Sequence, residues 1–389
     1  MTNQSRRLAE VQTPVIPIVS RWMAETPGTI SLGQGMVTYG PPPEARDAVN
    51  AFGQSVDDHK YGPVEGLPPL VDLIGSKLER ENDIDIRKGS RVVVTAGGNL
   101  AFMNAMLAIT DPGDEVVLPA PFYFNHEMAV VMAGARVVTV PTHADYQLDV
   151  EAIGRAIGPR TRAVVTVSPN NPTGAVYPET DLRAVNRLCA ERRIFHVHDE
   201  AYEYFLFDGA RHFSPGCIEG AARHTISLFS LSKAYGMASW RLGYMVIPEQ
   251  LWEAVNKIQD TLLICPPAVS QHAALAALTV GREWTASHLG PIDRVRRRVL
   301  AGLTGNGLPC DAPVPTGALY LLLGVRTVFD AMTVTERLIR EHGVAVVPGS
   351  AFGATGGCYL RVSFGALDEP TAIEAISRLA KGIRSVAAS

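Results

Sequence analysis

The chain has 389 residues, of which 47% are hydrophobic and 19% are charged, and its formal net charge at neutral pH is −4. These values predict a globular protein of two domains, or of one large domain with a satellite, and they disfavour nucleic acid as the main partner. The five cysteines form no Cys-x-x-Cys motif, the N-terminus lacks the apolar core of a signal peptide, and no apolar run is long enough to cross a bilayer. We therefore expect a soluble, cytoplasmic protein without a disulfide framework or a structural zinc site.

The first half of the chain predicts alternating strands and helices. The first forty residues are rich in proline and leave little room for long helices, but from about residue 65 short β-branched runs alternate with helical stretches. The predicted strands are 91–95, 115–119, 136–140, 162–167, 194–198 and 225–229, and the helices between them include 99–110, 123–133 and 178–192. Continuously apolar strands spaced by helices predict an α/β fold with a mainly parallel central sheet sandwiched by helices.

The pattern changes after about residue 265 and predicts a smaller α+β domain. Its predicted elements are helices 267–280 and 283–304, strands near 318–323, 344–347 and 359–364, and a C-terminal helix from 368. We expect a large domain over 46–275, a small domain over 276–389, and an N-terminal segment 1–45 that packs with the small domain.

Polar residues follow four of the predicted strands, at the sheet edge where open α/β folds bind ligands. They are Gly97-Gly98-Asn99, the run Asn170-Asn171-Pro172-Thr173-Gly174, Asp199 with Tyr202, and Ser230 with Lys233, and Arg241 lies eight residues after Lys233. Taken singly, each has a plain explanation as a turn, a helix cap or a solvated lysine. His196 and His198 share one face of a strand, and because no third ligand is evident we expect packed or hydrogen-bonded histidines and no metal site.

Taken together, these residues resemble the class I/II aminotransferases, the fold-type I enzymes that depend on pyridoxal 5′-phosphate (PLP). The most specific parts are Ser-x-Ser-Lys with an arginine eight residues later, and Asp-x-x-Tyr some thirty residues before. The resemblance extends from Ile30 to Arg361 and implies a homodimer with shared active sites.

The resemblance assigns the PLP contacts residue by residue. It implies that Lys233 carries the cofactor and moves the substrate proton, that Asp199 pairs with the pyridine nitrogen, and that Tyr202 and Asn171 contact the 3-oxygen. The implied phosphate ligands are Gly98, Asn99, Ser230, Arg241 and, from the neighbouring subunit, Tyr61. Tyr123 matches the aromatic residue that stacks on the ring, although core packing would also explain it.

The substrate contacts are implied in the same way. Arg361 matches the arginine that binds the α-carboxylate, with Asn171 and the backbone of Gly35 beside it. Many relatives read Gly-x-Pro-Asp-Phe where this chain has Gly35-Met36-Val37-Thr38-Tyr39, so we expect Tyr39 near the substrate side chain. The stretch 263–267 is apolar, and no second arginine is evident there.

The expected reaction is transfer of an amino group from an L-amino acid to a 2-oxo acid by a ping-pong mechanism. The apolar loop favours an apolar or aromatic donor. Stretches 203–205, 232–236, 240–244 and 257–260 resemble aromatic aminotransferases of plant and bacterial type, some of which use methionine.

Two alternatives remain open. The same scaffold hosts PLP-dependent lyases and amino acid oxidases, which the cofactor residues do not separate from aminotransferases. A degenerate relative that acts as a regulator or binding module is disfavoured, because Lys233 is present, no helix-turn-helix segment precedes the core, and the net charge does not suit DNA.

Overall fold

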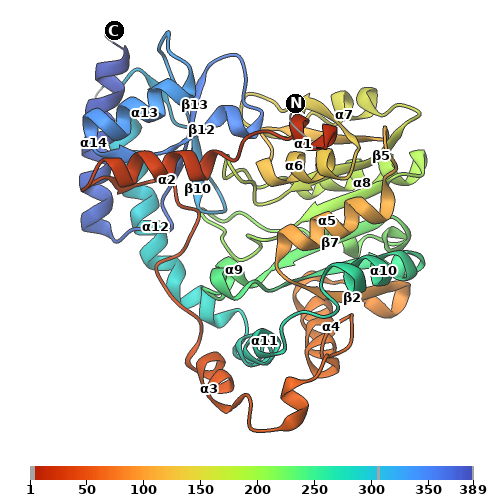
Figure 1. Cartoon of the computed structure of the whole chain (residues 1–389). Helices are drawn as coiled ribbons and strands as arrows, with labels where there is room; N and C mark the ends of the chain where they lie inside the picture. The colour runs from red at the N-terminus through yellow and green to blue at the C-terminus, as the bar shows by residue number, and fades with distance from the viewer. Residues whose placement is uncertain (1–4, 305–306, 388–389) are drawn as a thin grey trace.

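A seven-stranded sheet forms the centre of the computed structural model, which describes residues 5–304 and 307–387 (Figure 1). Its strands, in spatial order, are β2 (Ser90–Thr95), β8 (Gly243–Pro248), β7 (Thr225–Ser230), β6 (Phe195–Asp199), β5 (Thr161–Val167), β3 (Glu115–Ala120) and β4 (Arg136–Pro141). All neighbouring pairs are parallel except those of β8, which is antiparallel to both β2 and β7. The six predicted strands are confirmed, whereas β8 was not predicted, because only the four-residue helix α9 (Leu231–Ala234) and a short turn separate it from β7.

Helices cover both faces of this sheet, as the continuously apolar strands require. On one face lie α5 (Gly98–Ile109), α6 (Phe124–Met132) and α10 (Trp252–Leu262). On the other lie α3 (Pro43–Ala51), α4 (Pro68–Asn82), α7 (Val150–Ala156), α8 (Glu179–Arg192) and α11 (Ala268–Val280). The predicted helices 99–110, 123–133, 178–192 and 267–280 correspond to α5, α6, α8 and α11.

A second, smaller sheet lies to one side, at the upper left of Figure 1. Its antiparallel strands, in spatial order, are β12 (Val347–Pro348), β13 (Cys358–Ser363), β10 (Tyr320–Val325) and β9 (Cys310–Asp311). The helices around it are α12 (Glu283–Thr304), α13 (Ala331–His342) and α14 (Glu369–Ala387). The smaller α+β unit expected from the sequence is therefore present.

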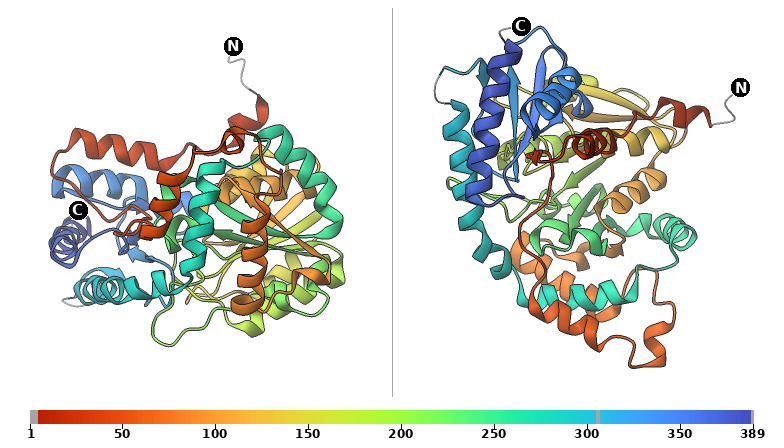
Figure 2. Two further views of the ribbon diagram at one scale, coloured as in Figure 1. Left: turned by 90° about the horizontal axis from the view of Figure 1, so that it is seen from below. Right: turned by 60° about the vertical axis from the view of Figure 1, so that its left-hand side comes forward.

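Helix α2 and strand β1 of the N-terminal segment lie against this smaller unit (Figure 2). Strand β1 (Ile30–Ser31) pairs in parallel with β11 (Val344–Ala345), and α2 (Val15–Glu25) packs its buried valines against α13 and β12. The expectation of an irregular N-terminus is wrong here, because α1 (Arg6–Glu10) precedes an eleven-residue helix. Pro17 lies in the first turn of α2, where a proline removes no intrahelical hydrogen bond.

Two further sequence predictions concern cysteines and membranes. All five cysteines lie within the described residues and carry free thiols. Over residues 5–304 and 307–387, none of the helices combines the length and apolarity that a membrane span needs.

Candidate active site

The parallel strands bring the predicted site residues to one edge of the large sheet. Strands β2, β5, β6 and β7 point the same way, so their carboxyl ends lie side by side. A cavity of about 290 Å³ opens there. It is lined by Gly98, Asn99, Tyr123, Val167, Asn171, Asp199, Ala201, Tyr202, Ser230, Ser232, Lys233 and Arg241.

A second cavity, of about 350 Å³, adjoins the first and reaches the smaller sheet. The two share Tyr123, Asn171, Tyr202 and Lys233 as lining residues. The second cavity is completed by Ile16, Val19, Ser20, Met23, Ser31, Gly33, Gln34, Gly35, Met36, Phe124, Tyr320, Val347 and Arg361. Together they form one continuous site with Lys233 at the junction.

Lys233 has an unusually acidic ammonium group. It lies on the short helix α9, where burial, followed by the positive charges of Arg361 and Arg241, lowers its pKa to about 8. A neutral amine is the nucleophilic form of lysine, so this environment activates Lys233 at mildly alkaline pH.

This pKa predicts the pH dependence of labelling by a small aldehyde. In dialysed protein, reductive alkylation of Lys233 by formaldehyde should rise about tenfold per pH unit below pH 8 and level off above it, because only the neutral amine reacts. Mass spectrometry of the peptide that carries Lys233 measures the rate. Arg361→Leu removes one of the two positive charges that lower the pKa of Lys233 and should therefore move the midpoint to higher pH. A wild-type midpoint near pH 10 would contradict the prediction.

Asp199 is held from two sides. Its Oδ1 accepts a hydrogen bond from the N–H of Ala201 at 3.0 Å, and its Oδ2 lies 3.0 Å from Nε2 of His126. The ring of His126 is buried and stacks on Phe102, with centroids 4.0 Å apart. Sequence reasoning missed His126; the available signal was its position three residues after Tyr123, which places both on one face of the first turn of α6.

The end of the first cavity that lies at the start of α5 is suited to bind an anion. The N-terminal N–H groups of α5 begin at Gly98 and have no partners within the helix. Gly97 has a φ of +87°, and a Cβ there would collide with the guanidinium of Arg241, so glycine gives that arginine room beside the helix start. The hydroxyl of Ser230 accepts the N–H of Ser232 at 3.2 Å and keeps its own proton available to donate.

Arg361 is the buried cation of the second cavity. Its Nη1 donates to Oδ1 of Asn171 at 3.0 Å and its Nη2 to the carbonyl of Gly33 at 2.8 Å. The guanidinium lies over the rings of Tyr320 and Phe352, with distances of 4.5 and 4.9 Å to the ring centroids. Among the described residues, its Nε has no hydrogen-bond partner. A buried guanidinium with spare donors is suited to a planar carboxylate.

Tyr320 is a second residue that sequence reasoning missed. Its hydroxyl lies 2.7 Å from that of Tyr202, and burial raises the pKa of both phenols. Strand β10 was predicted, but nothing in its sequence distinguished this tyrosine from a core aromatic residue. Tyr123 is partly buried, and its hydroxyl accepts a hydrogen bond from Nδ2 of Asn125 at 2.8 Å.

Two predicted residues line neither cavity. Tyr61 is 80% exposed and lies on the surface. Tyr39, which we expect near the substrate side chain, donates its hydroxyl to the carbonyl oxygen of Lys233 at 3.0 Å, and its proximity to a substrate stays a prediction. Its ring stacks on His288 of α12, with centroids 4.0 Å apart, and this packing turns it away from the cavity.

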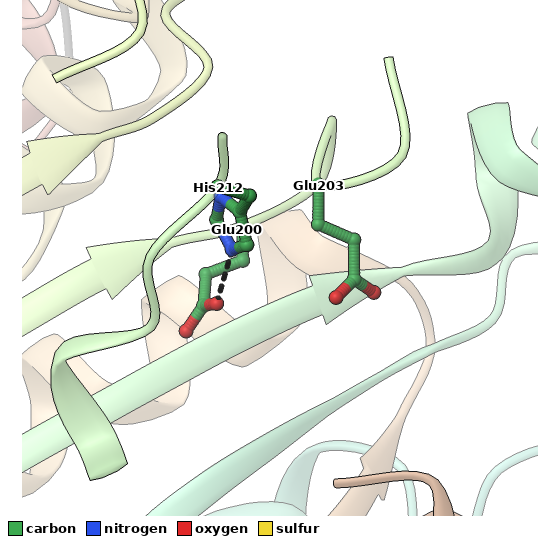
Figure 3. Close-up of side chains that lie close together, drawn as sticks. All are labelled: Glu200, Glu203 and His212. Atoms are coloured by element: carbon green, nitrogen blue, oxygen red, sulfur yellow. Dashed lines mark hydrogen bonds and ion pairs between the residues drawn. The ribbon is translucent and has the colours of Figure 1, made fainter. Parts of the chain in front are cut away.

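A separate cluster of Glu200, Glu203 and His212 lies near the site (Figure 3). Glu200 follows Asp199 directly and therefore points to the opposite face of the sheet. Nε2 of His212 lies 2.7 Å from Glu200, and Lys77 contacts both carboxylate oxygens of Glu203 at 2.6 and 2.7 Å. Residues of these types can hold a metal ion, but here Lys77 already supplies a positive charge, so we interpret the cluster as buried ion pairs.

The histidine pair on β6 is hydrogen-bonded, as the sequence predicts. The hydroxyl of Thr166 lies 2.8 Å from Nε2 of His196 and 2.6 Å from Nδ1 of His198. Burial, with His224 as the next cause, lowers the pKa of His196 to about 3, and burial also lowers that of His198. Both rings are therefore neutral near pH 7.

Comparison with known proteins places this geometry in context. The family model described as aminotransferase class I and II matches residues 27–379. The aromatic aminotransferase ISS1 of Arabidopsis thaliana is 36% identical over 98% of this chain and 96% of its own length, and the aspartate/prephenate aminotransferase of Thermus thermophilus is 38% identical over 83% of each. The solved structure of the Thermus thermophilus aspartate aminotransferase with maleate superposes with a TM-score of 0.89 at 34% identity, covering 98% of this chain and all of the other.

Proposed function

This chain belongs to the class I and II aminotransferase family, and from that premise we propose that it binds PLP at Lys233 and transfers amino groups from apolar or aromatic L-amino acids to 2-oxo acids by a ping-pong mechanism. The observation that supports the substrate class is the group of apolar side chains that α2, Met36 and Phe124 contribute to the second cavity.

The first cavity fits PLP in its donor set. The start of α5, Ser230 and Arg241 offer donors to a phosphate, Asp199 offers a carboxylate to a pyridinium nitrogen, and Lys233 offers an amine. When bound, PLP supplies an electron sink that stabilises the negative charge left at the substrate Cα after proton loss.

The chain's own residues then have separate tasks. Lys233 holds and moves the proton at Cα, for which a pKa near working pH is favourable. The carboxylate of Asp199 is held in one orientation by His126 and by the N–H of Ala201. Arg361 binds the α-carboxylate and so orients the Cα–H bond, which favours proton loss over decarboxylation.

The lining of the second cavity favours an apolar substrate side chain. Ile16, Val19 and Met23 of α2 face it together with Met36 and Phe124. Apart from Arg361 and Lys233, no described residue that lines it carries a positive charge for a distal carboxylate. Methionine fits the same lining, and the name of the Arabidopsis relative also indicates aromatic substrates for that enzyme.

Substrate preference tests this assignment directly. With one keto acid as acceptor, kcat/KM for phenylalanine, tyrosine or methionine should exceed that for aspartate by at least about tenfold, because a charged side chain would lose its hydration in an apolar pocket without a partner. Steady-state rates with each donor measure the ratio. A preference for aspartate would contradict the proposed substrate class while leaving amino transfer intact.

We propose that a second copy of the chain covers the surface around Tyr61. The N–H of Gly62 donates to Sγ of Cys265 at 3.3 Å, so this loop lies beside the end of α10, where Leu262 and Ile264 are 52% and 39% exposed. An exposed aromatic residue beside exposed aliphatic residues is typical of an interface. In such a dimer Tyr61 could reach the phosphate site of the partner.

Subunit mixing tests the shared site. Sedimentation should give a dimer, and mixing Tyr61→Phe with Arg361→Ala subunits should restore about a quarter of all sites, since half of randomly formed dimers are hybrids with one intact site each. Activity above the sum of the two separate variants is the measurement. A monomer, or mixing without any gain, would contradict the shared-site proposal.

A further inference from the structure

The helix that carries Lys233 is too short to satisfy its own carbonyl groups. Helix α9 has four residues, and the last carbonyls of any helix lack partners within it. The carbonyl of Lys233 accepts the N–H of Gly236 at 3.2 Å and the hydroxyl of Tyr39 at 3.0 Å. The carbonyl of Ala234 accepts the hydroxyl of Thr285 at 2.5 Å and lies 3.2 Å from that of Tyr39. Two hydroxyls from distant segments therefore complete this end of α9.

The contact between Tyr39 and α9 depends on a close approach of two backbone segments at Gly236. Gly236 has a φ of +62°, and a Cβ there would lie 2.5 Å from the carbonyl oxygen of Tyr39, so only glycine allows the two segments to approach this closely. Burial raises the pKa of Tyr39, so its hydroxyl keeps its proton and remains a donor.

The ring of Tyr39 packs against helix α12. The ring stacks on His288 at an interplanar angle of 27° and meets Trp284 edge-on, with centroids 6.4 Å apart. Thr285 lies between these two residues on the same helix. Tyr39 is thus fixed by packing on α12 and can hold α9 in one orientation.

We propose that Tyr39 and Thr285 are positioning residues for Lys233. Their hydroxyls fix the carbonyl end of α9 and thereby the orientation of the lysine side chain. This inference rests on the proposed function, since it assigns a purpose to the orientation of Lys233. It also explains the departure at Tyr39 from the Gly-x-Pro-Asp-Phe pattern, because phenylalanine would fill the same space without a donor.

Isosteric variants test the proposal. Tyr39→Phe and Thr285→Val each remove one hydroxyl and keep the packing, so we expect kcat to fall about five- to tenfold with KM within about twofold, the effect of one lost hydrogen bond on the step that Lys233 performs. The pH midpoint of the visible absorption of the lysine-bound cofactor should rise by about 0.5 unit, because the freed carbonyl dipoles favour a positive charge on Lys233.

Two matched variants serve as controls. Tyr146→Phe removes a partly buried tyrosine hydroxyl that lies 3.5 Å from the carbonyl of Leu322, and Thr335→Val removes a buried threonine hydroxyl that donates to Ala331 at 2.8 Å. Neither lines the site, so both should leave kcat and the midpoint unchanged. If the wild type is active but Tyr39→Phe and Thr285→Val behave like these controls, the inference is overturned and the proposed function stands. A wild type without visible absorption or amino transfer would overturn the proposed function and the inference with it.

Discussion

Replacing Lys233 by alanine is expected to lower the rate of amino transfer by at least about 10⁴-fold and to abolish the visible absorption of the lysine-bound cofactor. Under the proposed function the amine is both the covalent anchor and the group that moves the Cα proton, and a positioned acid–base group alone contributes about 10²–10⁴-fold. Single-turnover rates and the visible spectrum of the reconstituted protein measure the two effects.

Lys257→Ala is the matched control for this experiment. Lys257 is exposed on α10 and pairs with Glu253 of the same helix, at 2.6 Å. Its loss should leave the rate and the spectrum unchanged. If Lys233→Ala kept the absorption, another lysine would be the anchor and the assignment of the site would be wrong.

Replacing Arg361 by lysine should lower kcat/KM for every amino acid substrate by about 10²–10³-fold, although the charge is retained. The guanidinium reaches Asn171 and Gly33 with separate nitrogens and packs between two rings, and an ammonium group cannot reproduce that planar set of donors. Steady-state kinetics with several donors measure the loss, which should be similar for all of them because the α-carboxylate is common to all.

The cofactor should remain bound in this variant, which separates its effect from that of Lys233→Ala. Arg326→Lys is a suitable control, because Arg326 is exposed and contacts both oxygens of Asp311 at 2.8 and 2.9 Å on the surface. A loss confined to one class of side chain would show that Arg361 recognises the side chain and not the carboxylate.

The sequence predicted most of the large sheet and the residues of the first cavity. Strands such as 162–167 are apolar on both faces and end in polar residues, so both their burial and the site at their ends follow from local pattern. The antiparallel strand β8 is not predicted from the sequence, because no crossover helix precedes it. Helix α2 differs from the expectation because Pro17 lies in its first turn, where a proline removes no intrahelical hydrogen bond.

The residues that sequence reasoning missed, and the direction of the Tyr39 ring, depend on tertiary contacts. His126 contacts Asp199 across 73 positions of the chain, and Tyr320 contacts Tyr202 across 118, so no local pattern reports either pair. The pattern of its loop predicts Tyr39 near the substrate side chain, but the direction of the ring is set by α12, which lies more than 240 residues further along. Local pattern predicts which segments meet, but it does not predict the direction of a ring that is set by packing on a distant helix.

The adjacent acids at the end of β6 have a consequence for the alignment of that strand. Asp199 meets His126 on one face of the sheet, whereas Glu200 meets His212 on the other. A slip of β6 by one residue would exchange the two carboxylates and break both pairs at once. The contacts of Glu200 therefore help to fix the register of β6, and under the proposed function that register keeps Asp199 on the face where PLP would bind.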